Sequence, residues 1–576
     1  MGRELAISIG QHSDKGRKET NQDFHGVLIP DQPALALKGI SIALADGIST
    51  SKVGRVAAES AIKSFLTDYY CTSDSWSVKT SAQRVIAATN AWLHSQSRKG
   101  ADPYDRDKGY VCTLSVVVLK GTTAHIFHVG DSRVYRLSGK ALEQLTEDHR
   151  VAISAEKSYL GRALGANSQV EIDYRRVNVA LGDVLLLTTD GIYEHLSARD
   201  ISQIISGHPA DLDAAARAIV TKAYANGSDD NLTVQIVRID NLPTADSDDA
   251  LEQARDLPLP PLLEPRMVFD GYRIVRTLHT SSRSHIYLAV DTDDDSKVVL
   301  KIPSIDLRGD AAYLRRFMME EWVARRIDSA YVLKPRGRTR PRSYLYVAME
   351  FVEGKTLSQW MIDNPKPNVE AVRGIVEQIA KGLRAFHRKE MLHQDLRPEN
   401  IMIDTTDTVK IIDFGSTRVA GVAETRPRTV GDDILGTAQY TAPEYFLGEA
   451  GTTRSDLFSL GVIAYQMLTG RLPYGAGIAR ARTKSQMQKL GYTPASNINS
   501  DVPPWMDGAI ARAVSLSPDK RFEVLSEFLH DLRHPNARYL DARPVPLIER
   551  NPLLFWQALS LTLLVANFVL LYRLTR

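Results

Sequence analysis

The chain has 576 residues, of which 43% are hydrophobic and 24% are charged, and its formal net charge at pH 7 is +2. A single hydrophobic core rarely extends beyond about 250–300 residues, so this length predicts two large globular domains. The small net charge and the lack of a long basic run argue against nucleic acid as a partner. The two cysteines, Cys71 and Cys112, do not form a Cys-x-x-Cys motif, and so few thiols fit a reducing compartment.

Residues 1–240 alternate short apolar stretches with longer helical ones. Stretches such as 40–45, 114–119 and 184–188 are almost continuously apolar, which is typical of strands covered on both faces. Segments such as 53–70 have helical character instead. The pattern predicts a multidomain α+β protein whose first domain is an αββα sandwich, with helices on both sides of a largely antiparallel double sheet.

Aspartates stand where several of these predicted strands begin or end. Four of them lie next to an apolar stretch: Asp46, Asp131, Asp190 and Asp230. Because strand ends can meet at one edge of a sheet sandwich, we expect these carboxylates to converge. Carboxylate ligands suit hard cations such as Mg²⁺ or Mn²⁺, and two such ions can activate a water for in-line attack on phosphorus. A single Asp-Gly pair is more often a turn, so this prediction rests on the whole set.

The order of the motifs around these aspartates carries a family resemblance. The chain reads, in order, Asn21-Gln22-Asp23, Asp46-Gly47, Gly130-Asp131-Ser132, Thr189-Asp190-Gly191 and Asp230-Asn231. Over almost all of residues 5–240 it resembles the metal-dependent type-2C Ser/Thr protein phosphatases. The resemblance implies that the core metals are bound by Asp46, Gly47, Asp190 and Asp230. It also implies that Asp23 positions the attacking water, and that Asp131 holds a third, looser ion together with Asp190.

Two positions near Asp23 depart from the pattern of that family. Gln22 stands where a glutamate is usual, and Lys18 stands where the phosphate-binding arginine is usual. Lysine is a point charge without the bidentate fork of arginine, so we expect Lys18 to bind phosphate more weakly. Arg17, next to it in the chain, is the alternative phosphate ligand.

Residues 241–268 differ in composition from what precedes them. Prolines at 243, 258, 260, 261 and 265 accompany several acidic residues, which is typical of an extended linker. From Tyr272 onward, predicted strands come first and end near Lys301, and long amphipathic helices follow. This order predicts a second domain of two lobes over residues 269–533.

Residues suited to phosphate transfer lie in order along this second domain. Lys301 ends an apolar stretch, and Glu320, or its neighbour Glu321, lies on a following helix from which it can pair with that lysine. The chain then reads His393-Gln394-Asp395, Asn400 and Asp413-Phe414-Gly415. Transfer from ATP needs metal ions on the phosphates, a lysine on the α- and β-phosphates, and a group that positions the accepting hydroxyl.

Together with Ala442-Pro443-Glu444 and Asp456-Leu457-Phe458, these motifs resemble the eukaryotic-like Ser/Thr protein kinases over residues 269–533. The resemblance implies a nucleotide site formed by Lys301, Glu320, Met349, Glu350, Val352, Asn400 and Asp413. In it Asn400 and Asp413 hold Mg²⁺, Asp395 orients the substrate hydroxyl, and Arg397 keeps positive charge near the transferred phosphate. Glu444 would pair with Arg521 as a brace of the helical lobe.

The kinase resemblance also has departures. The three glycines expected over the nucleotide phosphates are replaced by His279, Ser281 and Ser284. Because glycine lets backbone amides approach a phosphate without a Cβ clash, we expect looser or slower nucleotide handling. Gln394 replaces the arginine that usually precedes the catalytic aspartate, so phosphorylation of the loop at 416–437 should have less influence on activity.

The C-terminal end has a different character. After a polar stretch at 534–552, residues 553–572 carry no charge and are mostly Leu, Val, Phe and Ala. About twenty residues rising 1.5 Å each just span a hydrocarbon core of about 30 Å. We therefore predict a transmembrane tail anchor in the cell membrane, with catalytic domains in the cytoplasm where ATP is available. The alternative is an amphipathic helix buried against the second domain.

These observations predict a bifunctional signalling enzyme with protein substrates. It would phosphorylate Ser or Thr using ATP and Mg²⁺, and hydrolyse phospho-Ser or phospho-Thr using Mn²⁺ or Mg²⁺. The kinase would also phosphorylate its own loop at 416–437, and the phosphatase would act there on Thr417, Thr425 or Thr429. The first alternative is a phosphatase regulated by a nucleotide-sensing kinase-like domain with weak or no catalysis. The second is a scaffold in which neither site turns over.

Overall fold

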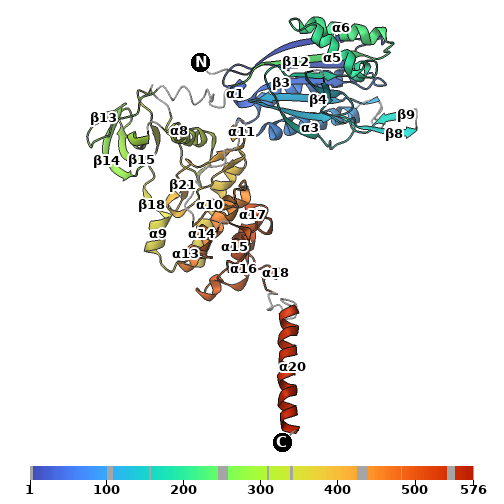
Figure 1. Ribbon diagram of the computed structural model, residues 1–576. Helices are drawn as coiled ribbons and strands as arrows, with labels where there is room; N and C mark the ends of the chain where they lie inside the picture. Colours follow the sequence, from blue (N-terminus) through green and yellow to red (C-terminus); the bar gives the residue numbers. More distant parts are fainter. Residues whose placement is uncertain are drawn as a thin grey trace.

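The fold has two α+β bodies and a final helix, α20 (Pro552–Leu574) (Figure 1). The structure, a computed structural model, describes residues 4–99, 105, 108–139, 141–154, 157–243, 257–307, 310–337, 342–423, 439–481, 483–540 and 552–574.

The N-terminal body contains two five-stranded antiparallel sheets. In the first sheet the strand order is β1 (Ala6–Asp14), β12 (Leu232–Asn241), β11 (Val184–Thr188), β6 (Arg133–Ser138) and β7 (Ala141–Gln144). In the second it is β10 (Asp173–Asn178), β5 (Thr123–Val129), β4 (Leu114–Lys120), β3 (Ile40–Asp46) and β2 (Asp23–Leu28). Two short strands, β8 (Arg150–Ser154) and β9 (Lys157–Leu160), form a separate hairpin.

Strand alternation explains why these sheets need cover on both sides. On β3, Ile42 and Leu44 belong to the core between the two sheets, whereas Ala43 and Ala45 face the other way. That outer face is covered by α2 (Gly54–Cys71) and α3 (Val78–Lys99). The outer face of the first sheet is covered by α5 (Ala198–Gly207) and α6 (Leu212–Ala225). The predicted αββα sandwich is confirmed.

The small lobe of the second body is a five-stranded antiparallel sheet with one long helix. Its strands in order are β13 (Val268–Phe269), β14 (Tyr272–Thr280), β15 (Ser284–Asp291), β16 (Lys297–Pro303) and β17 (Val347–Glu350), and the helix is α8 (Ala311–Arg326). The end of the predicted linker lies against this lobe: the Leu345 amide donates to the Pro258 carbonyl at 3.0 Å, and Leu263 is buried.

The large lobe is mainly helical, as the sequence pattern predicts. Its core is formed by α10 (Val369–His387), α13 (Thr453–Thr469), α16 (Pro504–Ala513) and α17 (Leu525–Arg533). Short elements complete it: α9 (Leu357–Asp363), β18 (Gly354–Thr356), β19 (Met391–Leu392), β20 (Ile401–Asp404), β21 (Val409–Ile411), β22 (Arg418–Val419), α11 (Ala420–Ala423) and α12 (Pro443–Phe446). Most of α13 is buried on all sides, which suits the central helix of a lobe.

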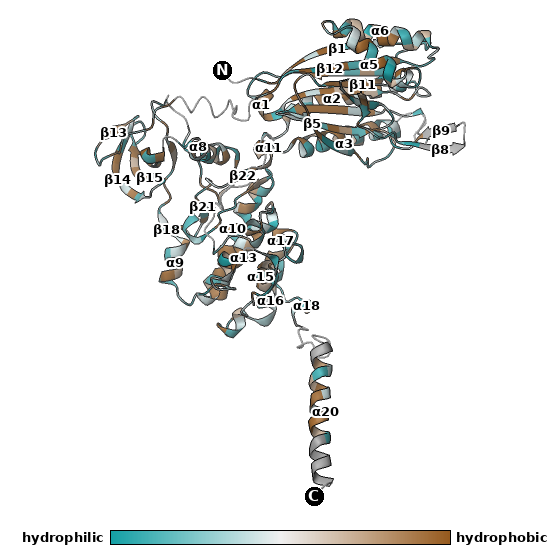
Figure 2. Ribbon diagram, viewed as in Figure 1, coloured by the Kyte–Doolittle hydropathy of each residue, from teal (hydrophilic) through white to brown (hydrophobic). Residues whose placement is uncertain are grey.

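The predictions of a transmembrane tail anchor at 553–572 and of a cell-membrane location are wrong. Among the described residues, none of the helices is both long and apolar enough to cross a membrane. The side chains of α20 are described over 555–567, the part coloured by hydropathy in Figure 2. That part rises about 20 Å, against about 30 Å for a hydrocarbon core. It also includes four polar side chains: Gln557, Ser560, Thr562 and Asn567.

Candidate active sites

The first candidate site lies where β2 begins and β3 ends. The two strands pair so that Asp23 is directly opposite Asp46. The Thr189 hydroxyl donates to Asp23 Oδ2 at 3.0 Å, whereas Asp23 Oδ1 is buried and has no hydrogen-bond partner among the described residues. A buried carboxylate oxygen without a donor is costly unless a cation or water approaches it, so Asp23 fits a place beside a bound ion.

Several aspartates at this edge influence each other through their charge. Burial raises the pKa of Asp46 well above its usual range, and the neighbouring carboxylates of Asp23, Asp190, Asp131 and Asp230 raise it further. Burial likewise raises the pKa of Asp23 to about 6 and that of Asp190 to about 7. A divalent cation would relieve this repulsion. In the described ranges, however, no three His, Cys, Asp or Glu side chains already converge as a ready set of metal ligands.

Two glycines allow the backbone segments of this site to approach closely. A Cβ on Gly47 would lie 2.3 Å from the Gly54 carbonyl oxygen, and a Cβ on Gly191 would lie 2.1 Å from the Asn231 carbonyl oxygen. Neither position tolerates a side chain, because backbone atoms cannot move aside cheaply. The Asp-Gly pairs at 46–47 and 190–191 therefore reflect packing between loops as well as chemistry.

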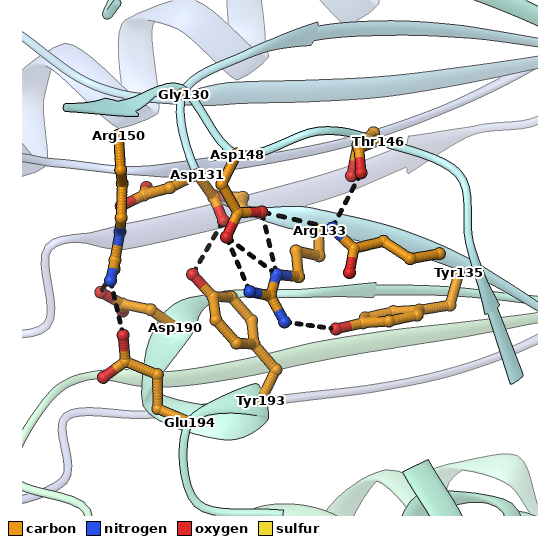
Figure 3. A network of polar contacts seen from close by, with 12 residues as sticks. Gly130, Asp131, Arg133, Tyr135, Thr146, Asp148, Arg150, Asp190, Tyr193 and Glu194 are labelled. Atoms are coloured by element: carbon orange, nitrogen blue, oxygen red, sulfur yellow. Dashed lines mark hydrogen bonds and ion pairs between the residues drawn. The ribbon is translucent and has the colours of Figure 1, made fainter. Parts of the chain in front are cut away.

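Arg150, at the start of β8, connects the carboxylates on one side of the site (Figure 3). Its guanidinium donates to Asp131 Oδ2 at 2.7 Å, to Asp190 Oδ2 at 3.0 Å and to Glu194 Oε1 at 2.7 Å. Asp131 and Asp190 are the pair expected to hold a third ion, so a protein cation already lies between them. Sequence reasoning missed Arg150, although it directly follows Asp148-His149.

A second arginine, Arg133, fixes the surrounding loop (Figure 3). Arg133 donates to both carboxylate oxygens of Asp148, at 2.9 Å through Nε and at 2.7 Å through Nη2. Its guanidinium carbon lies 3.7 Å from the centre of the Tyr193 ring, and the Tyr193 hydroxyl donates to the Asp131 carbonyl at 3.0 Å. This bidentate and stacked arrangement holds the backbone at Asp131 in place.

The residues near the expected phosphate position have separate roles. Lys18 Nζ lies 3.2 Å from Asp230 Oδ2, so this lysine reaches the site. Arg17 instead lies over the ring of Tyr224, 5.4 Å from its centre, and does not take the place of Lys18. The Gln22 side chain is buried and donates to the Ser51 carbonyl at 2.7 Å, which is a structural contact.

The second candidate site lies between the two lobes of the C-terminal body. Lys301 Nζ on β16 is 2.6 Å from Glu320 Oε2 on α8 and 3.6 Å from Asp413 Oδ1. Burial alone would lower the pKa of Lys301, but Asp413 and Glu320 together raise it. Burial raises the pKa of Glu320 to about 7, against the opposing effect of Lys301. The neighbouring Glu321 is held by Arg325 and Arg342, so Glu320 is the partner of the lysine.

The loop that carries Asp395 is held from both sides. The Asn400 side-chain amide donates to the Asp395 carbonyl at 2.9 Å and to its carboxylate at 3.2 Å. The buried carboxylate of Asp456, on α13, accepts from the backbone amides of His393 at 3.0 Å and Gln394 at 3.1 Å. These bonds stabilise Gln394 with a φ of 66°, a left-handed conformation that is rare outside glycine.

The Ser281 hydroxyl closes the turn where the nucleotide-binding glycines are missing. Ser281 Oγ donates to the Ser284 carbonyl at 3.1 Å, and the Ser284 amide donates to Ser281 Oγ at the same distance. Backbone bonds add to the turn, since the Ser304 amide donates to the Arg283 carbonyl at 2.9 Å. The loop between β14 and β15 is therefore shaped by side chains that bond within it.

The remaining predicted kinase residues lie around these two lobes. Met349 and Val352 are buried where the lobes join, and the carboxylate of Glu350 binds Lys410 Nζ at 2.7 Å. Arg397 Nε lies 3.2 Å from Glu399 Oε2. In the large lobe, the predicted brace is present: the Arg521 guanidinium donates to both carboxylate oxygens of Glu444 at 2.8 Å, and both side chains are buried.

Family models match both domains. Residues 11–222 match the family model for protein phosphatase 2C, and residues 272–532 match that for the protein kinase domain. The chain therefore contains a type-2C phosphatase-like domain followed by a protein kinase domain.

Individual relatives cover one domain or the other. The serine/threonine-protein kinase PrkC of Bacillus subtilis is 29% identical over 273 residues, which is 47% of this chain and 41% of that protein. The kinase domain of Mycobacterium tuberculosis PknI is 26% identical, with a TM-score of 0.37, over 47% of this chain and 98% of that one. The catalytic domain of the phosphatase PstP, solved with two manganese ions, is 23% identical, with a TM-score of 0.35, over 41% of this chain and 99% of that one. The chain spans less than half the length of PrkC.

Proposed function

We propose that the chain is a bifunctional enzyme, a protein Ser/Thr phosphatase and a protein Ser/Thr kinase acting on protein substrates. The observation that carries the kinase half is the buried Lys301–Glu320 pair beside Asp413, which is the arrangement that transfer from ATP requires. The phosphatase half rests on the crowded carboxylates around Asp46. Each domain supplies one direction of the same reversible modification.

In the phosphatase domain, we assign the metal-holding role to the carboxylates of Asp46, Asp190 and Asp230 and the carbonyl of Gly47. Bound Mn²⁺ or Mg²⁺ would supply Lewis acidity, which lowers the pKa of a water and stabilises charge on the phosphate. Asp23 lies directly opposite Asp46, so its carboxylate can position that water and accept its proton. Lys18 would bind the phosphate from the Asp230 side.

A third metal ion is less needed here than the family resemblance implies. Arg150 already places one positive charge between Asp131 and Asp190, at 2.7 and 3.0 Å from their oxygens. We therefore propose that Arg150 does the charge-balancing work of the looser ion. A metal ion would bind between this pair of carboxylates only if the guanidinium moved away.

In the kinase domain, Lys301 would bind the α- and β-phosphates of ATP, and Met349, Glu350 and Val352 would surround the adenine. Asn400 and Asp413 would hold Mg²⁺, which neutralises charge as the phosphoryl group moves. Asp395 would accept the proton of the substrate hydroxyl, held in position by Asn400. Arg397 would add positive charge near the transferred group.

One observation favours a second candidate function, a phosphatase regulated by a nucleotide-sensing kinase-like domain. The turn between β14 and β15 is closed by Ser281, so fewer backbone amides face a nucleotide phosphate than in a glycine loop. Such a domain would bind ATP without transferring phosphate at a useful rate.

Two assays decide between these functions. The first assay measures transfer of radiolabelled phosphate from ATP to a generic protein. Transfer that is lost in Asp395→Asn supports the kinase function. Equal labelling by the parent chain and by Asp395→Asn contradicts it. Manganese-dependent hydrolysis of p-nitrophenyl phosphate, lost in Asp190→Ala, supports the phosphatase. If neither assay exceeds its inactive variant, the chain is a scaffold.

A further inference from the structure

The loop between α2 and α3 of the phosphatase domain, residues 72–77, lies against the kinase domain at the junction of the two bodies (Figure 1). The indole N–H of Trp76 donates to the Arg388 carbonyl at 2.9 Å. The loop is shaped from within its own domain by the buried Lys38 ammonium, which donates to the Thr72 hydroxyl and the Ser73 carbonyl at 2.7 Å each. A loop held this firmly presents a defined surface. We call residues 72–80 together with Lys120 the docking surface.

Glu390 of the kinase domain binds the first turn of α3. Its carboxylate accepts from the Ser77 backbone amide at 2.6 Å and from the Thr80 hydroxyl at 2.5 Å. A carboxylate is stabilised at a helix N-terminus by the exposed amides and by the helix dipole. The backbone carbonyl of the same residue accepts from the Ala420 amide at 3.0 Å, so Glu390 joins α3 to α11.

Gly421 of α11 is enclosed by the docking surface. Its amide donates to the Ser75 carbonyl at 3.0 Å, and its carbonyl accepts from Lys120 Nζ at 2.5 Å. Lys120 is only 2% exposed, and burying an ammonium is favourable only when it is well bonded. A Cβ on Gly421 would lie 2.7 Å from the Trp76 carbonyl oxygen, so the two segments pack backbone to backbone.

A further contact reaches the helix that carries Glu320. The guanidinium of Arg326, the last residue of α8, lies 3.3 Å from the carboxylate of Asp74. The docking surface therefore touches α8, the turn at 388–390 before the Asp395 loop, and α11, which begins five residues after Gly415. These are the elements whose positions bring Glu320, Asp395 and Asp413 together.

We propose that the phosphatase domain is a built-in docking partner of the kinase domain that stabilises its Lys301–Glu320-paired arrangement. The regulatory part of this inference rests on the proposed kinase activity; the docking itself does not. Contacts made only in one arrangement of α8 and α11 shift the population toward that arrangement. Separation of the two domains would then lower phosphate transfer, because fewer molecules would hold Lys301 paired with Glu320.

The docking surface is remote from the phosphatase site, so a substitution can change one without changing the other. Lys120 ends β4 beside Ile40, where β3 begins, whereas Asp46 is where β3 ends. Seven residues of strand, from Ile40 to Asp46, span about 20 Å. Variants of the docking surface should therefore leave hydrolysis of p-nitrophenyl phosphate unchanged.

The test is amide hydrogen exchange of the full chain, followed over the peptide 418–423, which contains the amides of Ala420 and Gly421. We expect Trp76→Ala and, separately, Glu390→Gln to speed exchange there about tenfold. Trp92→Ala, an exposed tryptophan on α3 away from the kinase domain, is the matched control and should leave exchange unchanged. Unchanged exchange in both test variants overturns the docking.

The regulatory part has its own readout. In an Asp46→Asn background, which removes phosphatase turnover, Trp76→Ala should lower the rate of phosphate transfer from ATP about threefold or more, with the Trp92→Ala rate unchanged. Faster exchange at 418–423 with an unchanged transfer rate overturns the regulatory part and leaves the docking. If the parent chain transfers no phosphate at all, the proposed kinase function fails. The affinity for a fluorescent ATP analogue then replaces the transfer rate as the readout. Equal affinity in Trp76→Ala and in the parent overturns the coupling.

Discussion

Arg150 places one guanidinium against three carboxylates at the edge of the phosphatase site, and each of them is also a potential ligand for a cation. Burial alone would lower the pKa of Arg150. The neighbouring carboxylates, Asp131 above all, raise it above its ordinary value, so Arg150 stays charged at any accessible pH. The same carboxylates cannot bind the guanidinium and a metal ion with full strength together.

For this reason, Arg150→Ala should increase the number of Mn²⁺ ions bound per chain. Calorimetric titration of the parent should show two bound ions, and the variant should gain a weaker third one at Asp131 and Asp190. Arg162→Ala, which removes an ion pair with Asp173 on the same side of the domain, is the matched control. An equal stoichiometry in all three proteins would contradict the proposed role of Arg150.

The raised pKa values of the aspartates predict how stability depends on pH. Asp190 has a pKa of about 7 in the fold against an ordinary value of 3.8, so between these values the folded state binds more protons than the unfolded state. Stability contributed by the protonated form is present below about pH 4 and is lost as pH rises toward 7. The melting temperature of the metal-free phosphatase transition should therefore fall over this window, and less steeply in Asp190→Asn. A parallel fall in both proteins would show that Asp190 does not titrate there.

At the scale of elements, buried carboxylates tie distant segments of the kinase domain together. The Glu444–Arg521 pair joins α12 to the turn before Phe522, and the Ser455 hydroxyl on α13 donates to the same Glu444 carboxylate at 2.6 Å. Asp456, the next residue on α13, holds the Asp395 loop. One end of α13 thus positions both the Glu444–Arg521 pair and the Asp395 loop.

Arg521→Met should destabilise the kinase domain by about 3–5 kcal/mol, because the variant leaves the buried Glu444 carboxylate unpaired. Chemical denaturation followed by tryptophan fluorescence measures this change. Arg533→Met removes surface ion pairs to Glu370 and Glu377 and should cost only about 0–1 kcal/mol. Similar losses in the two variants would mean that the buried pair does not brace the lobe.

At the scale of the whole molecule, the two opposing activities proposed for this chain predict a modification that is made and removed continuously. Thr417 lies in the described part of the loop after Gly415, with its hydroxyl oxygen buried, whereas Thr425 and Thr429 lie outside the described residues. The predicted autophosphorylation at 416–437 and its reversal by the phosphatase domain therefore stay predictions.

Mass spectrometry of the purified full chain tests them. Asp46→Asn should increase phosphate occupancy within 416–437, because removal stops while addition continues. The double variant Asp46→Asn with Asp395→Asn should carry none, since addition also stops. Equal occupancy in the parent and in Asp46→Asn would mean that the phosphatase domain does not act on this loop.

Much of the fold was predictable because its signals are local. The almost continuous apolar run of β3 and the Asp46-Gly47 pair at its end predict a covered strand and a loop, and both are present. The same reasoning failed at α20, where the absence of charge over 553–572 predicted a membrane span that is not borne out among the described residues. Lack of charge is a weak criterion, because it counts polar uncharged residues such as Gln557 and Asn567 as compatible with lipid.

By itself, the sequence determined the two domains and the residue types at each site, because these depend on motifs of fixed short spacing. Tertiary structure alone decided which of two adjacent glutamates pairs with Lys301, that Arg150 lies between Asp131 and Asp190, and that the 72–77 loop contacts α11. Such pairings join segments up to hundreds of residues apart. They depend on which side chains the packed elements bring within about 3 Å of each other. No local pattern in the sequence encodes that proximity.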